Sequence, residues 1–254
     1  MRYLAALASL LLLTTTAARA DMDEARQAFA GGDWQEAASQ ARQAGGAEGY
    51  AYAAQALVTQ LMLEPDYPDR RALTREAVEL AETAFREDSD SAEARLRLAI
   101  SLGYNGRYTN SMRAYLMRMP QRGRALLESV VADDPGNVWA LGTLGAWHLE
   151  VARRGGARGM QMLDASVEAG TGHYRQAIAL DPDNPALRYF LALGLIALDE
   201  AGQDDMAWQQ LEMALALEPR DAFEAGVRDE AAQLLALRGD RDAATAWATD
   251  RMTR

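Results

Sequence analysis

Residues 174–184, YRQAIALDPDN, carry the pattern that decides the fold: the end of an amphipathic helix, an acidic turn with a proline, and the start of another helix. The pattern recurs as LLESVVADDPGN at residues 126–137 and as LEMALALEP at residues 211–219. A degenerate copy, AETAFREDSD, occupies residues 81–90. In each copy proline or aspartate ends one helix and an amphipathic helix follows directly. Pro182 and Pro219, in the copies at residues 174–184 and 211–219, are 37 residues apart, so the sequence predicts a repeat of helix pairs.

The rest of the chain has the same helical character. Apolar residues recur at three- and four-residue spacing almost throughout, and no segment alternates with a period of two. Alanine and leucine dominate the apolar set, and both favour helix. We therefore predict an all-α fold.

The repeat resembles the tetratricopeptide repeat family, whose period is about 34 residues. Gly170, Tyr174, Ala177 and Pro182 match the second half of that motif, with glycine in place of the family's alanine. Small residues such as Gly145 would let two antiparallel helices approach closely. The resemblance implies a right-handed tetratricopeptide-like α-solenoid of about six helix pairs. It would form one domain over residues 21–254, with an irregular insertion at about residues 103–124.

A narrower resemblance is carried by WALGTLGAWHLEVA at residues 139–152, GGA at residues 155–157 and AS at residues 165–166. This stretch resembles uncharacterised tetratricopeptide proteins of proteobacteria. It is also distantly similar to the helical domain of the eukaryotic regulator of microtubule dynamics family. The export segment described next argues against a microtubule role.

Residues 1–20 have the features of a cleaved signal peptide. Arg2 supplies a positive start, residues 4–13 form an apolar run, and residues 18–20 (Ala-Arg-Ala) form the small–x–small pattern before a cleavage site. The apolar run is about half the length that spans a bilayer. We therefore predict a periplasmic protein whose processed chain begins at Asp21.

Composition excludes several classes of function. The 254 residues carry a formal net charge of −11, which disfavours binding to nucleic acid. The chain has no cysteine, which excludes disulfides and thiol catalysis. All 26 basic residues are arginine, which excludes a catalytic or phosphate-binding lysine. The longest apolar run after residue 20, at residues 189–198, is too short to span a membrane.

No catalytic or metal-binding motif is recognisable. The two histidines, His148 and His173, are 25 positions apart, and His148 occupies a repeat position that predicts a packed structural residue. The sequence HLEVA at residues 148–152 lacks the second histidine of a zinc-protease motif. Asp181 and Asp183 lack the glycine and glutamate of a calcium loop. We therefore expect no enzymatic activity, no cofactor and no metal.

Two stretches interrupt the repeat. Residues 103–124 carry five arginines and no acid, and residues 153–160 carry three more arginines. Both flank the helix predicted over residues 137–152, so we expect them to lie near one another, and inserted positions in a repeat array often form its binding face. The arginines either pair with acidic helix faces or bind an anion or acidic partner. The arginine candidates for binding are Arg107, Arg113, Arg153, Arg154 and Arg158.

The inner face of the predicted solenoid is mostly apolar. The first helix of each pair lines that face, where partners bind. The apolar candidates for binding are Leu96, Ile100, Trp139, Leu149, Tyr189, Leu193 and Ile196. Because an exposed groove of this length is unusual in a soluble monomer, something should cover it. The candidates are the chain's own residues 111–119 acting as a plug, a partner helix or peptide, or an apolar molecule such as a lipid.

These observations predict a non-catalytic periplasmic protein that acts as a protein–protein interaction module or assembly scaffold. Its expected partner is a protein or peptide. The alternative is a carrier or binding protein for an apolar or anionic small ligand such as a lipid. Neither a nucleic-acid partner nor a transmembrane segment after residue 20 is expected.

Overall fold

The computed structural model describes residues 19–199 and 204–254. The predicted export segment, residues 1–20, lies outside the described residues except for its last two positions. Every regular element in the described part of the chain is a helix, which confirms the predicted all-α class.

A helix over residues 19–31 opens the described chain, and twelve further helices follow it within the described ranges. Their bounds are α2 (Trp34–Ala44), α3 (Gly46–Leu63), α4 (Arg70–Glu87), α5 (Ala92–Arg107), α6 (Ser111–Leu116), α7 (Met119–Asp133), α8 (Val138–Leu163), α9 (Val167–Leu180), α10 (Pro185–Leu198), α11 (Asp204–Ala216), α12 (Ala222–Leu235) and α13 (Arg241–Thr253).

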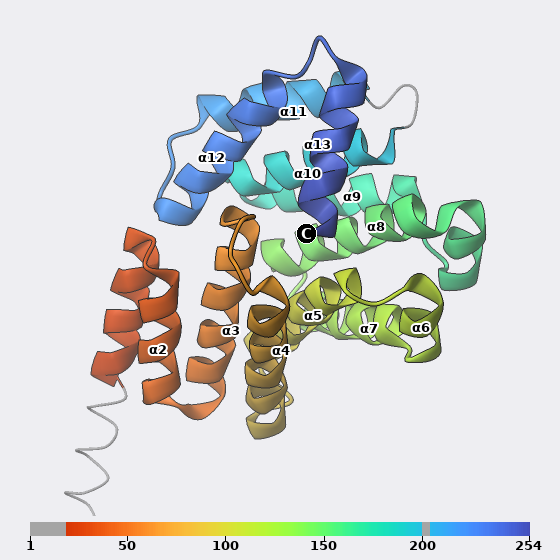
Figure 1. Ribbon diagram of the computed structural model, residues 1–254. Helices are drawn as coiled ribbons and strands as arrows, with labels where there is room; N and C mark the ends of the chain where they lie inside the picture. The colour runs from red at the N-terminus through yellow and green to blue at the C-terminus, as the bar shows by residue number, and fades with distance from the viewer. Residues whose placement is uncertain (1–18, 200–203) are drawn as a thin grey trace, which may run out of the picture.

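Successive helices pack against one another along most of the chain, as Figure 1 shows. The exception is the short helix α6, which is inserted between α5 and α7 and packs on α7. This arrangement of neighbouring helices is consistent with an α-solenoid.

The turns of the repeated sequence pattern begin each following helix through a side-chain cap. Asn184 Oδ1 accepts a hydrogen bond from the backbone N–H of Ala186 at 3.1 Å, and Pro185 occupies the first turn of α10. Asn137 caps α8 and Ser91 caps α5 in the same way. Each cap satisfies backbone donors that a helix start leaves free, which explains why helices restart directly after these turns.

Glycines set the distance between the central helices. A Cβ atom added to Gly145 of α8 would lie 2.6 Å from the ring of Tyr174 and 2.8 Å from the carbonyl oxygen of Gly170, both in α9. A Cβ atom on Gly142 would lie 2.8 Å from Leu187 of α10. The close approach predicted for Gly145 is therefore present, and α8 is pressed against both α9 and α10.

The last helices return to the first half of the chain. Helix α12 packs on α3, where Gly226 would place a Cβ atom 2.8 Å from Leu63. The ring of Phe223 lies 6.0 Å from that of Trp139 at the start of α8. Figure 1 shows α13 passing over α10, and hydrogen bonds from Arg107 tie the end of α13 to α5. The last helices therefore pack against helices from the first half and the middle of the chain.

This return covers the face that was predicted to be an open groove. Helix α10 packs against α8, α9, α11, α12 and α13, and twelve of its fourteen residues are buried. Tyr189, Leu193 and Ile196 are 4%, 7% and 4% exposed. The predicted covering was partly wrong: the chain covers this face itself, but with α12 and α13 rather than with residues 111–119.

Polar contacts fix α13 in the centre. Arg251 Nε lies 2.8 Å from Glu230 Oε2 in a largely buried ion pair, and the hydroxyl of Tyr189 donates to the same carboxylate oxygen at 3.4 Å. Arg107 of α5 donates to the backbone carbonyl of Arg254 at 2.8 Å. Burial raises the pKa of Glu230, and the charge of Arg251 opposes that rise. These bonds connect the end of α13 to α5 and α12, and α10 to α12.

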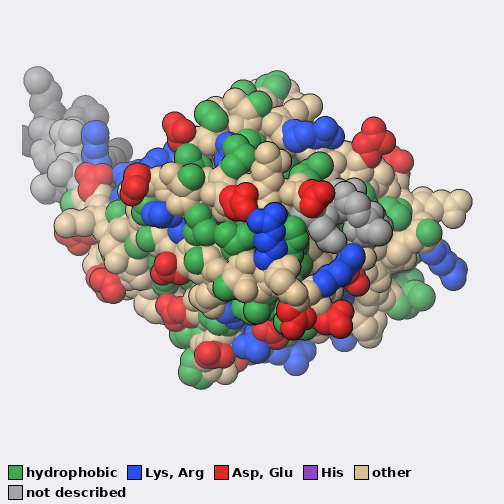
Figure 2. All heavy atoms as spheres, turned by 90° about the horizontal axis from the view of Figure 1, so that it is seen from above, with side chains coloured by type: hydrophobic (Ala, Val, Ile, Leu, Met, Phe, Trp, Pro, Cys, Tyr) green, Lys and Arg blue, Asp and Glu red, His purple; other side chains and the backbone are tan. Residues whose placement is uncertain are grey.

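Figure 2 looks down on the side of the molecule formed by α11, α12 and α13. Acidic and basic side chains are scattered there among hydrophobic ones, without a large area of one sign. Within the described ranges, no helix is both long enough and apolar enough to cross a bilayer.

Candidate functional site

The apolar candidates from the sequence form the core rather than a surface. Leu96 and Leu149 are each 1% exposed. Ile100 and Trp139 are partly buried, and Trp139 packs on Phe223. Together with the three buried residues of α10, these side chains stabilise the packing of the helices, and the buried ones are inaccessible to a partner in this structure.

Three of the five arginine candidates are held by contacts inside the molecule. Arg107 donates to backbone carbonyls of α13 and stacks 3.8 Å from the ring centre of Tyr104. Arg153 makes a two-pronged contact with Glu150, with both hydrogen bonds at 2.8 Å. Arg154 donates to backbone carbonyls at the end of α5 and just after it. Only Arg113 and Arg158 of the five remain exposed without such contacts in the described part of the chain.

The two interruptions of the repeat lie side by side, as the sequence predicted. Arg154 donates to the carbonyl oxygens of Gly106 at 3.0 Å and Thr109 at 3.1 Å. On the other side, Arg124 donates to the carbonyl oxygens of Leu163 at 2.8 Å and Asp164 at 3.1 Å. Two arginines therefore join the region around α6 to the last turns of α8.

These two stretches place large apolar side chains in solvent. Met112, Leu116 and Met117 of the first stretch are 69%, 72% and 59% exposed. Met162, which follows the second stretch in the last turn of α8, is 48% exposed. Five arginines of the same two stretches are exposed, and the side chains of three of them, Arg113, Arg118 and Arg158, make no hydrogen bond or ion pair in the described part of the chain. We call this set the methionine–arginine surface, and it consists of Met112, Arg113, Leu116, Met117, Arg118, Arg158 and Met162.

Backbone geometry explains why this surface projects. Helix α6 has six residues, begins at a cap from Asn110 and ends before Arg118, whose φ of 55° is left-handed. Helix α8 is kinked at Gly156, where φ is 54°, and its last turns continue from there to Leu163. Left-handed backbone is easy for glycine and costs about 1 kcal/mol or more for other residues. Two short helical pieces thus leave the repeat and turn outwards, at the right of Figure 1.

The methionine–arginine surface is basic within an acidic protein. Residues 94–127 and 151–163 contain no acidic side chain. Within the described ranges, the side chains of Arg113, Arg118 and Arg158 make no hydrogen bond or ion pair. At the right-hand end of Figure 2, the end at which α6 lies in Figure 1, basic and hydrophobic side chains project from the molecule. The surface therefore offers free positive charge next to exposed apolar groups.

The sequence pointed to this region, but one of its three alternatives, that residues 111–119 fill the groove as a plug, is wrong, because Met112 and Met117 are exposed. Met112 and Leu116 are four residues apart in α6, so they lie on one face of the helix. Ala114 is the single residue of α6 that is buried. A six-residue helix with one small buried side chain cannot fill a groove. The sequence did not show how short this helix is, so it did not exclude the plug.

A second place of interest is a groove of about 500 Å³ where α7, α8 and α9 meet, which holds both histidines of the chain. The rings of His148 and His173 stack with 5.6 Å between their centres. The backbone N–H of Ser166, the cap of α9, donates to His148 Nδ1 at 3.2 Å. The sequence treated the two histidines as separate, and the pairing of α8 with α9 brings them together.

Both imidazoles are held in the neutral form. Burial, then the neighbouring His173, then Arg124 lower the pKa of His148 from 6.5 to about 4. Burial and Arg124 also lower the pKa of His173. Arg124 itself is engaged by Glu128 at 2.7 Å. A base with a pKa near 4 is a weak proton acceptor at neutral pH, so the pair fits a packing role between α8 and α9, as predicted for His148.

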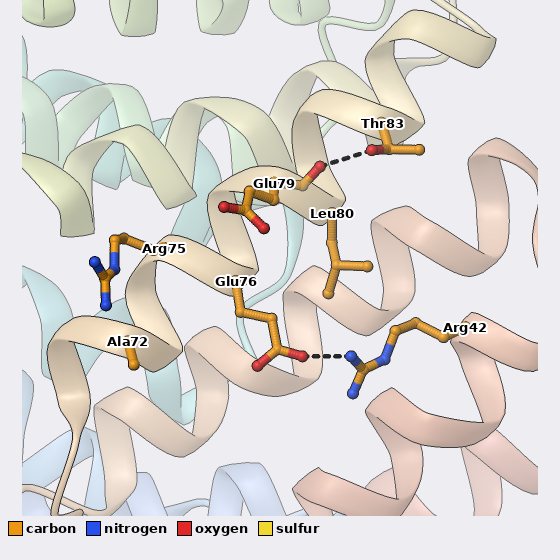
Figure 3. A pocket seen from close by; sticks show the side chains of 7 residues that line it. All are labelled: Arg42, Ala72, Arg75, Glu76, Glu79, Leu80 and Thr83. Carbon is orange, nitrogen blue, oxygen red and sulfur yellow. Dashed lines mark hydrogen bonds and ion pairs between the residues drawn. The ribbon is translucent and has the colours of Figure 1, made fainter.

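An open groove between α2 and α4 is shown in Figure 3. Arg42 of α2 forms an ion pair with Glu76 of α4 across it, and Arg75 points away from that pair. The hydroxyl of Thr83 donates to the carbonyl oxygen of Glu79. The polar groups here tie two helices together, and no nucleophile stands next to a base among the lining residues.

Among the residues that the structure describes, no three histidine, aspartate or glutamate side chains are grouped so that they could hold a metal ion. No family model matches the chain. No curated protein matches it either. The methionine–arginine surface is therefore the candidate site with the clearest chemistry: apolar groups and unpaired guanidinium groups, all open to solvent.

Proposed function

We propose that the protein is a non-catalytic docking module. A right-handed tetratricopeptide-like solenoid of about six helix pairs is its scaffold, and the methionine–arginine surface binds its partner. The observation that carries the proposal is the exposure of three large apolar side chains close together in the sequence, Met112, Leu116 and Met117. Adjacent exposed apolar side chains of this size mark interaction sites in soluble proteins.

The packing supports a scaffold role. The glycine contacts of α8 leave no space between α8, α9 and α10. Helix α13 is bonded to α5 and, through Arg251, to Glu230 of α12. Arg154 and Arg124 hold the projecting pieces to this core through backbone carbonyls. A partner would therefore meet a surface whose position is already fixed, which reduces the entropy lost on binding.

Export to the periplasm is part of this proposal and rests on the sequence of residues 1–20. An apolar ligand inside the predicted groove would need the face formed by Tyr189, Leu193 and Ile196, and α12 and α13 occupy that face.

Site-specific photo-crosslinking tests the docking role. A photoreactive amino acid is placed at Met117, which is 59% exposed, and in a matched control at Met213, which is 40% exposed on α11. The proposal expects an adduct from position 117 in living cells and none from position 213. Equal adducts from both positions, or none from position 117 in a protein with unchanged circular dichroism, would contradict it. The mass of the adduct shows whether the partner is a protein or a lipid.

A further inference from the structure

The chemistry of the methionine–arginine surface also identifies a class of partner. Building on the proposed docking role, we propose that this surface binds the anionic face of a phospholipid bilayer. In this complex α6 lies at the level of the lipid headgroups, its apolar side chains reach the acyl boundary, and its arginines contact phosphate groups.

Most of the exposed apolar groups of this surface lie on α6 and on the residue after it. Met112 and Leu116 share one helix face, and Met117 follows directly. Each methylene group moved from water into hydrocarbon raises partitioning about fourfold. Methionine side chains are unbranched and adapt to irregular surroundings, which suits the disordered boundary of a bilayer.

The positive charges of this surface are the guanidinium groups of Arg113, Arg118 and Arg158. Their guanidinium groups have no partner in the described part of the chain, and no acidic residue lies in the segments that carry them. An arginine near an anionic bilayer strengthens binding about fivefold. Its long stem can follow the apolar layer while the charge stays at the phosphates.

The net charge of the whole protein supports one orientation. The chain carries a formal charge of −11, so an anionic bilayer repels most of its surface. The methionine–arginine surface is the exception, because its two segments hold arginines and no acids. Charge therefore favours an approach in which α6 and the last turns of α8 lead.

Shape favours a bilayer over a protein groove as the occupant. The surface belongs to two short pieces that project at one end of the molecule (Figure 1). None of its residues lines the groove at the histidines or the groove between α2 and α4. A projecting tip finds a complementary shape in a deformable headgroup layer, whereas a protein partner would need a matching pocket.

Vesicle binding tests the proposal. The protein is compared with Leu116→Ser/Met117→Ser, with Arg113→Gln/Arg118→Gln/Arg158→Gln, and with the control Leu180→Ser/Met213→Ser, which removes exposed apolar groups elsewhere. All variants share one N-terminus, so residues 1–20 contribute equally if present. Cosedimentation is measured with vesicles of phosphatidylglycerol and phosphatidylcholine, and with phosphatidylcholine alone.

We expect binding to the anionic vesicles and much weaker binding to the neutral ones. The triple arginine variant should lose binding by on the order of 100-fold, that is fivefold for each arginine, and should lose its salt dependence. The double serine variant should bind less at every salt concentration, and the control should bind as the unaltered protein does. Equal binding by all variants, or equal binding to both vesicle types, overturns the proposal.

A fluorescent probe gives a second measurement. The chain has no cysteine, so Leu116→Cys and Leu180→Cys can each be labelled at one position with a polarity-sensitive dye. Anionic vesicles should shift the emission of the dye at position 116 to shorter wavelength and leave the dye at position 180 unchanged. Absence of this shift together with a protein adduct from position 117 refutes the bilayer and leaves the docking role standing. Absence of both the shift and any adduct refutes the docking role as well.

Discussion

The substitution Gly145→Ala tests the close contact between α8 and α9. Its new methyl group would lie 2.6 Å from the ring of Tyr174 and 2.8 Å from the carbonyl oxygen of Gly170. Tyr174 is fully buried, and the carbonyl belongs to the backbone of α9. Neither neighbour can move aside without moving its helix, so α8 and α9 must separate.

The expected loss follows from two opposing effects. Alanine in a helix interior is more stable than glycine by about 0.5–1 kcal/mol, and overpacking a core costs about 1–3 kcal/mol. Because the clash is with backbone and with a fully buried ring, we expect the upper part of that range. The net loss should be about 1–2 kcal/mol, or a fall of about 2–8 °C in melting temperature for a protein of this size.

Gly172→Ala is the matched control. Gly172 lies in α9, and a Cβ atom there would meet nothing within 4 Å. This change should raise stability by about 0.5–1 kcal/mol. Thermal and urea unfolding followed by circular dichroism measure both variants. If Gly145→Ala matched or exceeded the unaltered protein while Gly172→Ala behaved as expected, the close approach of α8 and α9 would be refuted.

Three further outcomes are expected. Glu230→Gln leaves Arg251 largely buried without its partner and should lower the unfolding free energy by about 3 kcal/mol, whereas Asp66→Asn, which removes an exposed ion pair, should cost under about 1 kcal/mol in the same urea titration. The folded-state pKa of His148 is about 4, below its ordinary 6.5, so between those values protons bind the unfolded chain and not the folded one. Stability should therefore fall as pH drops from 6.5 to 4, by on the order of 3 kcal/mol from this group, and His148→Asn should reduce the fall measured by urea unfolding across that range. Intact-mass measurement of protein from the osmotic-shock fraction should show Asp21 as the first residue, and a chain that still begins at residue 1 would refute the predicted export.

The helix starts after the repeated turns and the close contact at Gly145 were predictable because both are local. The end of α8 was predicted wrongly, because the helix expected to end at residue 152 continues through a kink at Gly156 to Leu163. An asparagine after an acidic turn caps the next helix wherever the chain goes afterwards, as Asn137 and Asn184 show. A glycine among large residues at repeat spacing indicates a close contact, and Gly145 makes one. These features depend on neighbours within one helix pair, which the repeat itself supplies.

The candidate site was predicted less well because it depends on where the last helices go. No sequence pattern within α12 or α13 predicts that these helices pack on α10. One indication was present: α10 is apolar on every side, and such a helix is buried all round rather than lining a groove. Arg107 and Arg154 could not be distinguished from Arg113 and Arg158, because their partners are backbone carbonyls that carry no sequence pattern.

The packing of α12 on α3 has a consequence for how the molecule comes apart. In an open array each repeat touches only its neighbours, so unfolding can begin at either end and spread. Here Arg254 pairs with Asp66, 188 positions earlier, and Gly226 meets Leu63. Loosening either end therefore removes contacts from the other. The array should melt as one cooperative unit, and amide protons in α3 and α12 should exchange with solvent at matching rates.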